Sequence, residues 1–167
     1  GDVWTWTAID SETKLVPAWF VGDRTANSAF EFCYDLKKRF SGEVQITSDG
    51  LQSYRFAVAS AFDDGTNHYA QLVKIYGKDE QGKEVVTGIV KEPRFGTPDM
   101  DLVSTSYVER QNLTMRMGMR RFTRLTNGHS KKIENHVAAI SLHFMHYNFC
   151  RKHLSLKTSP AVAAGVT

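Results

Sequence analysis

The 167 residues predict an α/β fold with a mixed sheet, and two features of the sequence lead to this prediction. Short stretches rich in β-branched and aromatic residues have the composition of strands. Longer stretches carry apolar residues at helical spacing. Along the chain they run strand, strand, helix, strand, helix, strand pair, helix, helix, an order that is typical of helices packed on a sheet. The length and the 41% of apolar residues fit one soluble domain with a proper core.

The amino-terminal part predicts a hairpin and then a helix. Residues 3–9 (VWTWTAI) alternate as a strand does, and residues 15–21 (LVPAWFV) follow after a short polar turn as the partner strand. Apolar residues then recur at helical spacing, which predicts a helix over 25–40 that ends at Gly42.

The next segment places an acidic residue at the end of a strand. Residues 44–47 (VQIT) predict a short strand, which runs into Ser48-Asp49-Gly50 and then a helix over 52–62. Open α/β sheets place their active sites at this kind of strand end. Asp49 is therefore a candidate site residue, although an Asp in such a turn commonly serves only the turn.

The middle and the end of the chain predict further elements. Residues 68–76 (HYAQLVKIY) form a strand, and 77–101 form a Gly-, Pro- and charge-containing insertion with one hairpin-like piece, VVTGIVK. We therefore expect a β insertion at about 70–101. A long helix is expected over 130–152, because apolar residues there step by four and three.

A helix beginning near Ser106 carries the second candidate carboxylate. Ser106 and Glu109 have the spacing of a capping box. Glu109, Asn112 and Arg116 share one helix face, since they stand at i, i+3 and i+7. Three apolar residues lie on another face that can pack inward: Val108, Met115 and Met119. Glu109 has a plainer interpretation as a cap partner that favours the helix dipole.

Positive charge is concentrated after Glu109, which we expect to be buried. Seven basic residues and no acidic residue lie between 110 and 132, and the whole chain is only +3, so the rest carries a net −4. Such a run is often a solvated face, but contacts of Arg and Lys with phosphate also hold DNA. Three residues beside Glu109 are expected to hold phosphates: Arg110, Asn112 and Arg116. Five residues would extend this basic track: Arg120, Arg121, Arg124, Lys131 and Lys132.

The two carboxylates together indicate a metal-dependent reaction. A strand-end Asp49 and a helical Glu109 can converge on one hard cation, and Mg²⁺ takes oxygen ligands of this kind, with Mn²⁺ as a possible substitute. Two such ions about 4 Å apart can activate the attacking oxygen and stabilise the leaving one in phosphoryl transfer. Two carboxylates are few for that task, so a third is expected.

Several motifs resemble the DDE transposases of the bacterial insertion sequence one family, and the likeness covers nearly the whole chain. The matching segments are WTWTAIDSETKLVPAWFVGDRT (4–25), TSDG (47–50), SYVERQN (106–112), RRFTRLTNGHSKKIEN (120–135) and YNFCRKHLSL (147–156). The resemblance implies a ribonuclease-H-like catalytic domain over 1–167 that cleaves DNA and transfers strands in the transposition of a mobile element. It assigns the second and third metal-binding carboxylates to Asp49 and Glu109. The implied partners are double-stranded DNA, as element ends and target, and further copies of the chain during the reaction, in the bacterial cytoplasm.

The first carboxylate stays open between two assignments. Asp10 completes the letters D, D, E, but it lies at the predicted hairpin bend, where Asp is a favoured turn residue. The resemblance instead places the first Asp on an earlier strand, so we expect the chain to lack that strand, that Asp and an amino-terminal DNA-binding region. Such a fragment should bind metal poorly and leave DNA uncut. Two alternatives follow, a catalytically incomplete DNA-binding or assembly remnant and a ribonuclease-H-like nuclease.

Two further expectations concern location and other metals. No apolar run is long enough to span a membrane, and Cys33 and Cys150 have no paired spacing, which indicates free thiols in a reducing compartment. A zinc site on one face of the last long helix is the less favoured interpretation of four residues, since one helix rarely brings more than two ligands to one ion: His143, His146, Cys150 and His153.

Overall fold

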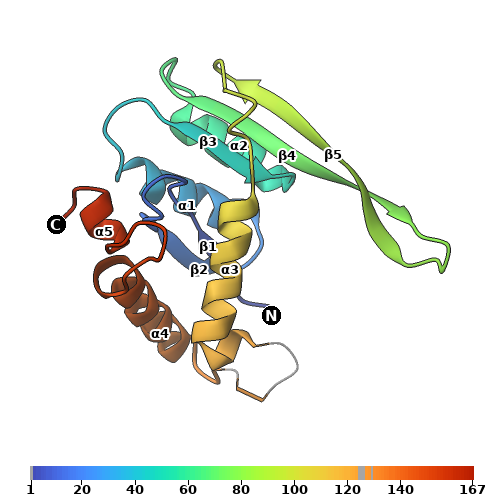
Figure 1. The fold of residues 1–167 in the computed structure, drawn as a ribbon. Coiled ribbons are helices and arrows are strands. Elements are labelled where there is room, and N and C mark those ends of the chain that lie inside the picture. Colours follow the sequence, from blue (N-terminus) through green and yellow to red (C-terminus); the bar gives the residue numbers. More distant parts are fainter. Residues whose placement is uncertain (1, 124–126, 129) are drawn as a thin grey trace. The chain divides into compact units, whose positions relative to one another are not determined.

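The computed structural model describes residues 2–123, 127–128 and 130–167 and confirms the α/β class (Figure 1). In chain order its elements are β1 (Trp4–Thr7), β2 (Trp19–Gly22), α1 (Ala26–Lys37), β3 (Gln45–Asp49), α2 (Gln52–Phe62), β4 (His68–Lys78), β5 (Glu84–Phe95), α3 (Ser106–Gly118), the 3-10 turn η1 (Arg120–Phe122), α4 (Ile133–Met145), the π-helical turn η2 (His146–Cys150) and α5 (Pro160–Ala163). Within the described residues, no helix is both long and apolar enough to cross a membrane.

The chain forms two compact units, each with its own sheet. The sheet unit comprises Gly1–Trp4 and Gly22–Thr105, and the helical unit comprises Thr5–Val21 and Ser106–Thr167. β1 and β2 form a two-stranded sheet, while β3, β4 and β5 form a separate three-stranded sheet in that order.

The three-stranded sheet is mixed. β3 pairs in parallel with β4, from Gln45 opposite His68 to Asp49 opposite Leu72. Helix α2 provides the crossover that a parallel pair requires, and it packs against α1. Helix α1 begins where the sequence predicts, because the Thr25 side chain accepts a hydrogen bond from the Ser28 amide as its N-cap.

The segment expected to be a hairpin-like insertion is different in the structure. VVTGIVK lies inside β5, a single 12-residue strand that pairs antiparallel with β4 along its length. The turn between the two strands is closed by a 3.0 Å hydrogen bond from the Asp79 amide to the Lys83 carbonyl oxygen. β3 pairs with β4 only as far as Leu72. From Val73 onward β4 and β5 therefore form a two-stranded ribbon, which we call the β4–β5 ribbon.

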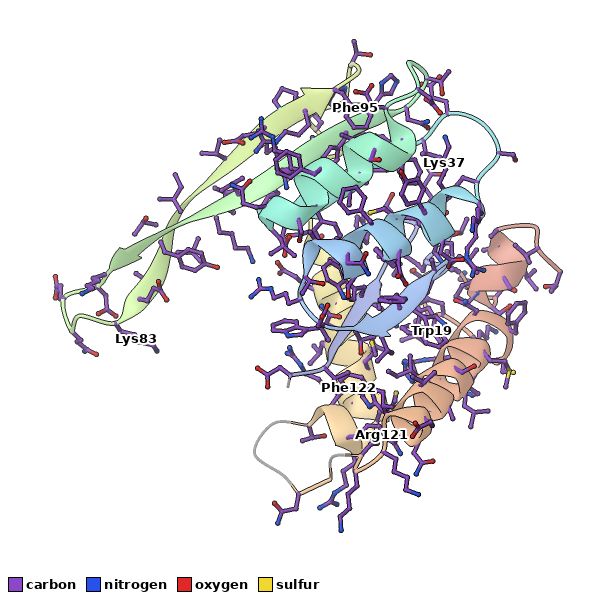
Figure 2. All side chains as sticks on the ribbon, turned by 180° about the vertical axis from the view of Figure 1, so that it is seen from behind. Trp19, Lys37, Lys83, Phe95, Arg121 and Phe122 are labelled. Carbon is purple, nitrogen blue, oxygen red and sulfur yellow. The ribbon has the colours of Figure 1, made fainter. Side chains whose placement is uncertain are left out.

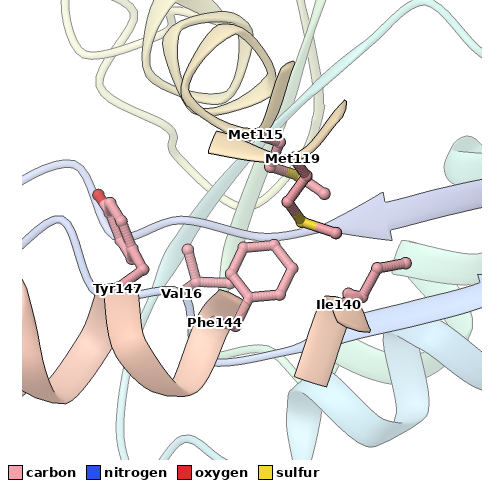
Figure 3. Close-up of a cluster of buried hydrophobic side chains, with 6 residues drawn as sticks. All are labelled: Val16, Met115, Met119, Ile140, Phe144 and Tyr147. Carbon is pink, nitrogen blue, oxygen red and sulfur yellow. The ribbon is translucent and has the colours of Figure 1, made fainter. Parts of the chain in front are cut away.

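The helical unit is built around one apolar cluster (Figure 3). Its buried members come from the hairpin and from α3, α4 and η2: Val16, Met115, Met119, Ile140, Phe144 and Tyr147. The Asn148 side chain fixes the hairpin to η2, since it accepts from the Val16 amide at 3.0 Å and donates to the Val16 carbonyl oxygen at 2.9 Å. The helix expected over 130–152 thus begins at Ile133 and ends in a π-helical turn at Cys150.

Candidate functional site

Asp49 lies where the sequence predicts, as the last residue of β3, and its side chain is exposed. One carboxylate oxygen, Oδ1, accepts a 3.1 Å hydrogen bond from the Leu51 amide, immediately before α2 begins. This bond is an Asx turn that leads the chain from strand to helix. Asp49 thus serves the turn with one oxygen while its carboxylate remains accessible to solvent.

A buried polar network supports this turn from β4 and β5. The Gln71 side chain, only 2% exposed, donates to the Asp49 carbonyl oxygen at 2.9 Å and accepts from Arg94 Nε at 2.8 Å. The buried Ser48 hydroxyl is 2.7 Å from the Tyr69 hydroxyl. Because buried polar groups are costly unless they are paired, these bonds fix the backbone of Asp49 closely.

Two phenols near Asp49 have raised pKa values. Burial, followed by the negative charge of Asp49, raises the pKa of Tyr54 well above its usual value. Burial also raises the pKa of Tyr69 to about 12, and its hydrogen bond with Ser48 opposes that change. Because a phenol is already protonated near pH 7 at its usual pKa, these shifts do not change the charge next to Asp49.

Glu109 lies in the first turn of α3, which begins at Ser106 as predicted. The expectation that Glu109 is buried is wrong, because its residue is exposed. Gln111 and Met115, each 2% exposed, occupy the inward face of the helix instead. Glu109 shares its face with half-buried Asn112 and exposed Arg116, in agreement with the helical spacing.

Apolar packing and one cation–π contact position α3. Met115 and Met119 reach the core of the helical unit, as predicted. The Lys14 ammonium lies 4.1 Å from the centroid of the Tyr107 ring and ties the hairpin turn to the first turn of the helix. The carboxylate of Glu109 is therefore presented by a helix that is anchored along its opposite side.

The cationic residues predicted to contact DNA differ in their surroundings. Five of them are exposed: Arg110, Arg116, Arg120, Lys131 and Lys132. Arg121 is half-buried, and its Nη1 donates to Ser130 Oγ at 2.6 Å and to the Asn135 carbonyl oxygen at 2.7 Å. Arg121 thus holds the start of α4 against η1 as well as carrying charge. Arg124 lies outside the described residues.

Asp10 occupies the hairpin turn and binds donors of that turn. Its Oδ2 accepts from the Thr13 hydroxyl at 2.5 Å and its Oδ1 from the Glu12 amide at 3.1 Å. Both carboxylate oxygens are therefore used locally, as expected of a turn-forming Asp.

No group of three His, Cys, Asp or Glu side chains that could hold a metal ion occurs within the part of the chain that the structure describes. The zinc interpretation of the last helix has no such group to support it. His143 instead packs in the helical unit, stacked on Tyr147 and edge-on to Phe144. Its pKa is lowered by burial and then by the charge of Arg151.

The buried network includes functional candidates that the sequence did not single out. Gln71 and Arg94 connect the base of the Asp49 turn to β5, where Arg94 also forms an ion pair with Glu92. A polar residue between the apolar neighbours of the strand HYAQLVKIY was the available signal. A shallow hollow of about 300 Å³ lies between α2 and β5, with Arg94 in its lining, but none of the sequence-predicted site residues lines it.

Comparison of the chain with protein-family models, with characterised proteins and with solved structures gives no significant match. The interpretation of the site therefore rests on the motifs of the sequence and on the geometry of the two units.

Proposed function

We propose that this chain is the catalytic region of a DNA transposase that resembles the bacterial insertion sequence one family. The observation that carries the proposal is the position of Asp49: exposed, at the carboxyl end of a parallel strand, and held by a buried network. This is where α/β enzymes gather their reactive groups. The type of reaction, DNA cleavage and strand transfer, is inferred from the motifs that resemble this family, which occur in order from the hairpin to η2.

The strands of each sheet are compatible with the proposal. β1 and β2 form one sheet, and β3, β4 and β5 form another, with β3 parallel to β4. In the resemblance, the strand that carries the first catalytic Asp is not assigned to any of these five strands.

The donor set suits a hard divalent cation. Asp49 and Glu109 offer carboxylate oxygens, both residues are exposed, and Mg²⁺ prefers oxygen ligands completed by water and phosphate. Mg²⁺, with Mn²⁺ as a substitute, would supply Lewis-acid stabilisation of charge on the phosphate during strand cleavage and joining. Asp49 and Glu109 are the residues of this chain that would hold the ion.

The cationic residues after Glu109 have a separate role in this proposal. Arg110, Arg116 and Arg120 are exposed on and just after the same helix, so they can bind the phosphates of a DNA strand presented to the carboxylates. Lys131 and Lys132 continue this basic track at the start of α4.

A second candidate function is a DNA-binding or assembly remnant without catalysis. The observation that favours it is the Asp10 carboxylate, whose two oxygens accept hydrogen bonds from its own turn. This side chain is therefore poorly suited to serve as the third metal ligand, and the proposed site has two assigned carboxylates.

Nicking and joining of DNA with Mg²⁺ or Mn²⁺ test the proposal. The full-length protein is compared with its Asp49→Asn and Glu109→Gln variants on supercoiled plasmid, and joined products are separated from nicked ones. Residues 1–167 alone, run beside them, are expected to leave the plasmid uncut. A transposase joins strands and loses activity in both variants, whereas a nuclease of the same site gives nicks alone. The remnant binds DNA in all three forms and cuts in none. Absence of DNA binding by all three contradicts both functions.

Salt dependence of DNA binding tests the basic track by itself. Each phosphate contact contributes about −0.9 to the slope of log K against log salt concentration, so the triple change of Arg110, Arg116 and Arg120 to Gln should reduce the magnitude of the slope by about 2.7. A control that removes the same number of charges, with Lys74, Lys78 and Lys83 of the β4–β5 ribbon changed to Gln, should leave the slope unaltered. Fluorescence anisotropy with a labelled duplex measures both.

A further inference from the structure

The β4–β5 ribbon has unpaired strand edges. β3 pairs with β4 only up to Leu72, and β5 is the outer strand of its sheet, with no strand beyond it among the described residues. Figure 2 shows the ribbon extending to a tip near Lys83, with Phe95 at its other end. Unpaired edges of this length are ready to pair with another strand.

The same ribbon exposes large apolar side chains. Five of them are 40% to 58% exposed: Ile75, Tyr76, Val86, Ile89 and Val90. The register places Tyr76, Val86 and Ile89 on one face of the ribbon and Ile75 and Val90 on the other. A two-stranded ribbon is marginally stable by itself in water, and neighbouring exposed apolar side chains on such a ribbon favour contact with a partner. A partner that covered it would stabilise the ribbon.

The composition of the ribbon favours a protein partner over DNA. Between Lys74 and Val90 there are three lysines and three acidic residues, so the segment is neutral. It therefore lacks the positive charge that drives binding to phosphates.

A β-bulge makes this edge self-complementary. The register passes from Ile75 opposite Gly88 to Tyr76 opposite Val86, so Thr87 is the extra residue. In a regular strand, Glu84 and Lys91 would lie on opposite faces, because side chains alternate. The extra residue shifts the alternation of side chains by one position, so Glu84 and Lys91 lie on the same face of the strand.

We propose that β5 pairs antiparallel with β5 of a second copy about a two-fold axis at Thr87–Gly88. In a symmetric antiparallel pair, one strand position lies on the two-fold axis, opposite the same position of the second copy, so the paired segment has an odd number of positions. The bulge meets this requirement, because Thr87 and Gly88 together take one position and the eight residues from Glu84 to Lys91 fill seven. Glu84 then faces Lys91 of the second copy at both ends, and Val86 faces Ile89. Opposite charges and apolar pairs at directly opposed positions are the contacts that stabilise neighbouring strands.

The ends of the paired segment are compatible with this pairing. Lys91 Nζ donates one 2.6 Å hydrogen bond to the Met100 carbonyl oxygen, and an ammonium has two further donors that a carboxylate of the second copy can accept. Pro93 follows, and because it has no N–H to donate, it ends the segment that is able to pair. This inference rests on the ribbon alone and does not depend on the proposed function.

Charge exchange with the intact chain tests the pairing. Sedimentation equilibrium over a wide concentration range should give a dimer for the wild type. Glu84→Lys places lysines opposite each other twice, and Lys91→Glu places glutamates opposite each other twice, so each should weaken the dimer at least about tenfold. The double variant E84K/K91E should regain most of the affinity.

Dimer formation by a mixture of the two single variants is the strongest test. A variant that failed to fold would not dimerise in the mixture either, so recovered dimerisation shows that both variants are folded. In the mixed dimer, position 84 of the E84K chain faces position 91 of the K91E chain, so a lysine meets a glutamate. At the other end, the unchanged Lys91 of the first chain faces the unchanged Glu84 of the second. The mixture should therefore dimerise when neither variant does so alone.

Three results would overturn the proposal. The first is a wild type that is monomeric over the whole concentration range. The second is a pair of single variants whose dimer affinity is unchanged. The third is a mixture that dimerises no better than its two components.

Discussion

The two units present their carboxylates in different ways. In the sheet unit, hydrogen bonds among buried polar groups hold the backbone of Asp49, with Gln71 at their centre. In the helical unit, Glu109 is carried by a helix that is anchored through Met115 and Met119 in an apolar core. Apolar packing provides most of the folding free energy, whereas a polar network fixes geometry at little net gain. Substitutions in the two supports should therefore have different consequences.

The largest effect is expected in the helical core. Phe144 is 2% exposed and stacks on Trp19, with ring centroids 6.1 Å apart. Phe144→Ala should lower the free energy of unfolding by about 4 kcal/mol, through lost burial and the cavity left behind. Urea unfolding measures the loss, and Phe149→Ala, at a residue that is 47% exposed, is the matched control with a much smaller effect. Equal losses in the two variants would contradict this description of the core.

An intermediate effect is expected in the polar network. Gln71→Met removes the donor to the Asp49 carbonyl oxygen and the acceptor for Arg94, and should cost about 2 kcal/mol. Gln71→Glu keeps the acceptor for Arg94 but places a buried carboxylate oxygen against the Asp49 carbonyl oxygen, so it should cost at least as much. In both variants the amide resonances of Gly50 and Leu51 should shift. If these resonances stay in place, the network does not hold the turn.

The smallest effect concerns pH and the helical unit. Burial, followed by Arg151 and His146, lowers the pKa of His143 from 6.5, so the unfolded chain binds its proton more readily than the folded chain does. The stability from neutral His143 is thus fully present above about pH 6.5 and is lost as the pH falls below it. His143→Phe should flatten the pH dependence of the unfolding midpoint. His136, whose pKa burial also lowers, should preserve part of it. An identical pH profile in the variant would contradict the assignment to His143.

Local signals made much of the fold predictable. The bounds of α2 and the first residue of α3 agree with the sequence, because strand ends, glycine turns and the Ser106–Glu109 spacing act over a few residues. The length of β5 was not predictable, because the bulge at Thr87 and the proline at position 93 interrupt the alternation. Its pairing with β4 over the whole length is a tertiary contact that alternation does not reveal.

The candidate site was predictable in one part and not in another. Asp49 could be predicted because strand, turn and helix follow directly along the chain. Gln71 could not, because a polar residue in a strand looks the same whether it faces solvent or a half-buried Arg94 that is 23 residues away. Arg121 is a second residue whose structural role was hidden. Its place in a basic run predicts contact with DNA, but its side chain also donates hydrogen bonds to Ser130 and Asn135.

Paramagnetic broadening by Mn²⁺ tests whether Asp49 and Glu109 bind one cation, as proposed. Substoichiometric Mn²⁺ broadens the amide resonances of residues near a bound ion. If one ion is shared, Gly50 and Leu51 should broaden together with Arg110 and Gln111 over one titration, and either Asp49→Asn or Glu109→Gln should abolish both responses. Broadening of only one pair, or loss of one response without the other, would contradict a shared site.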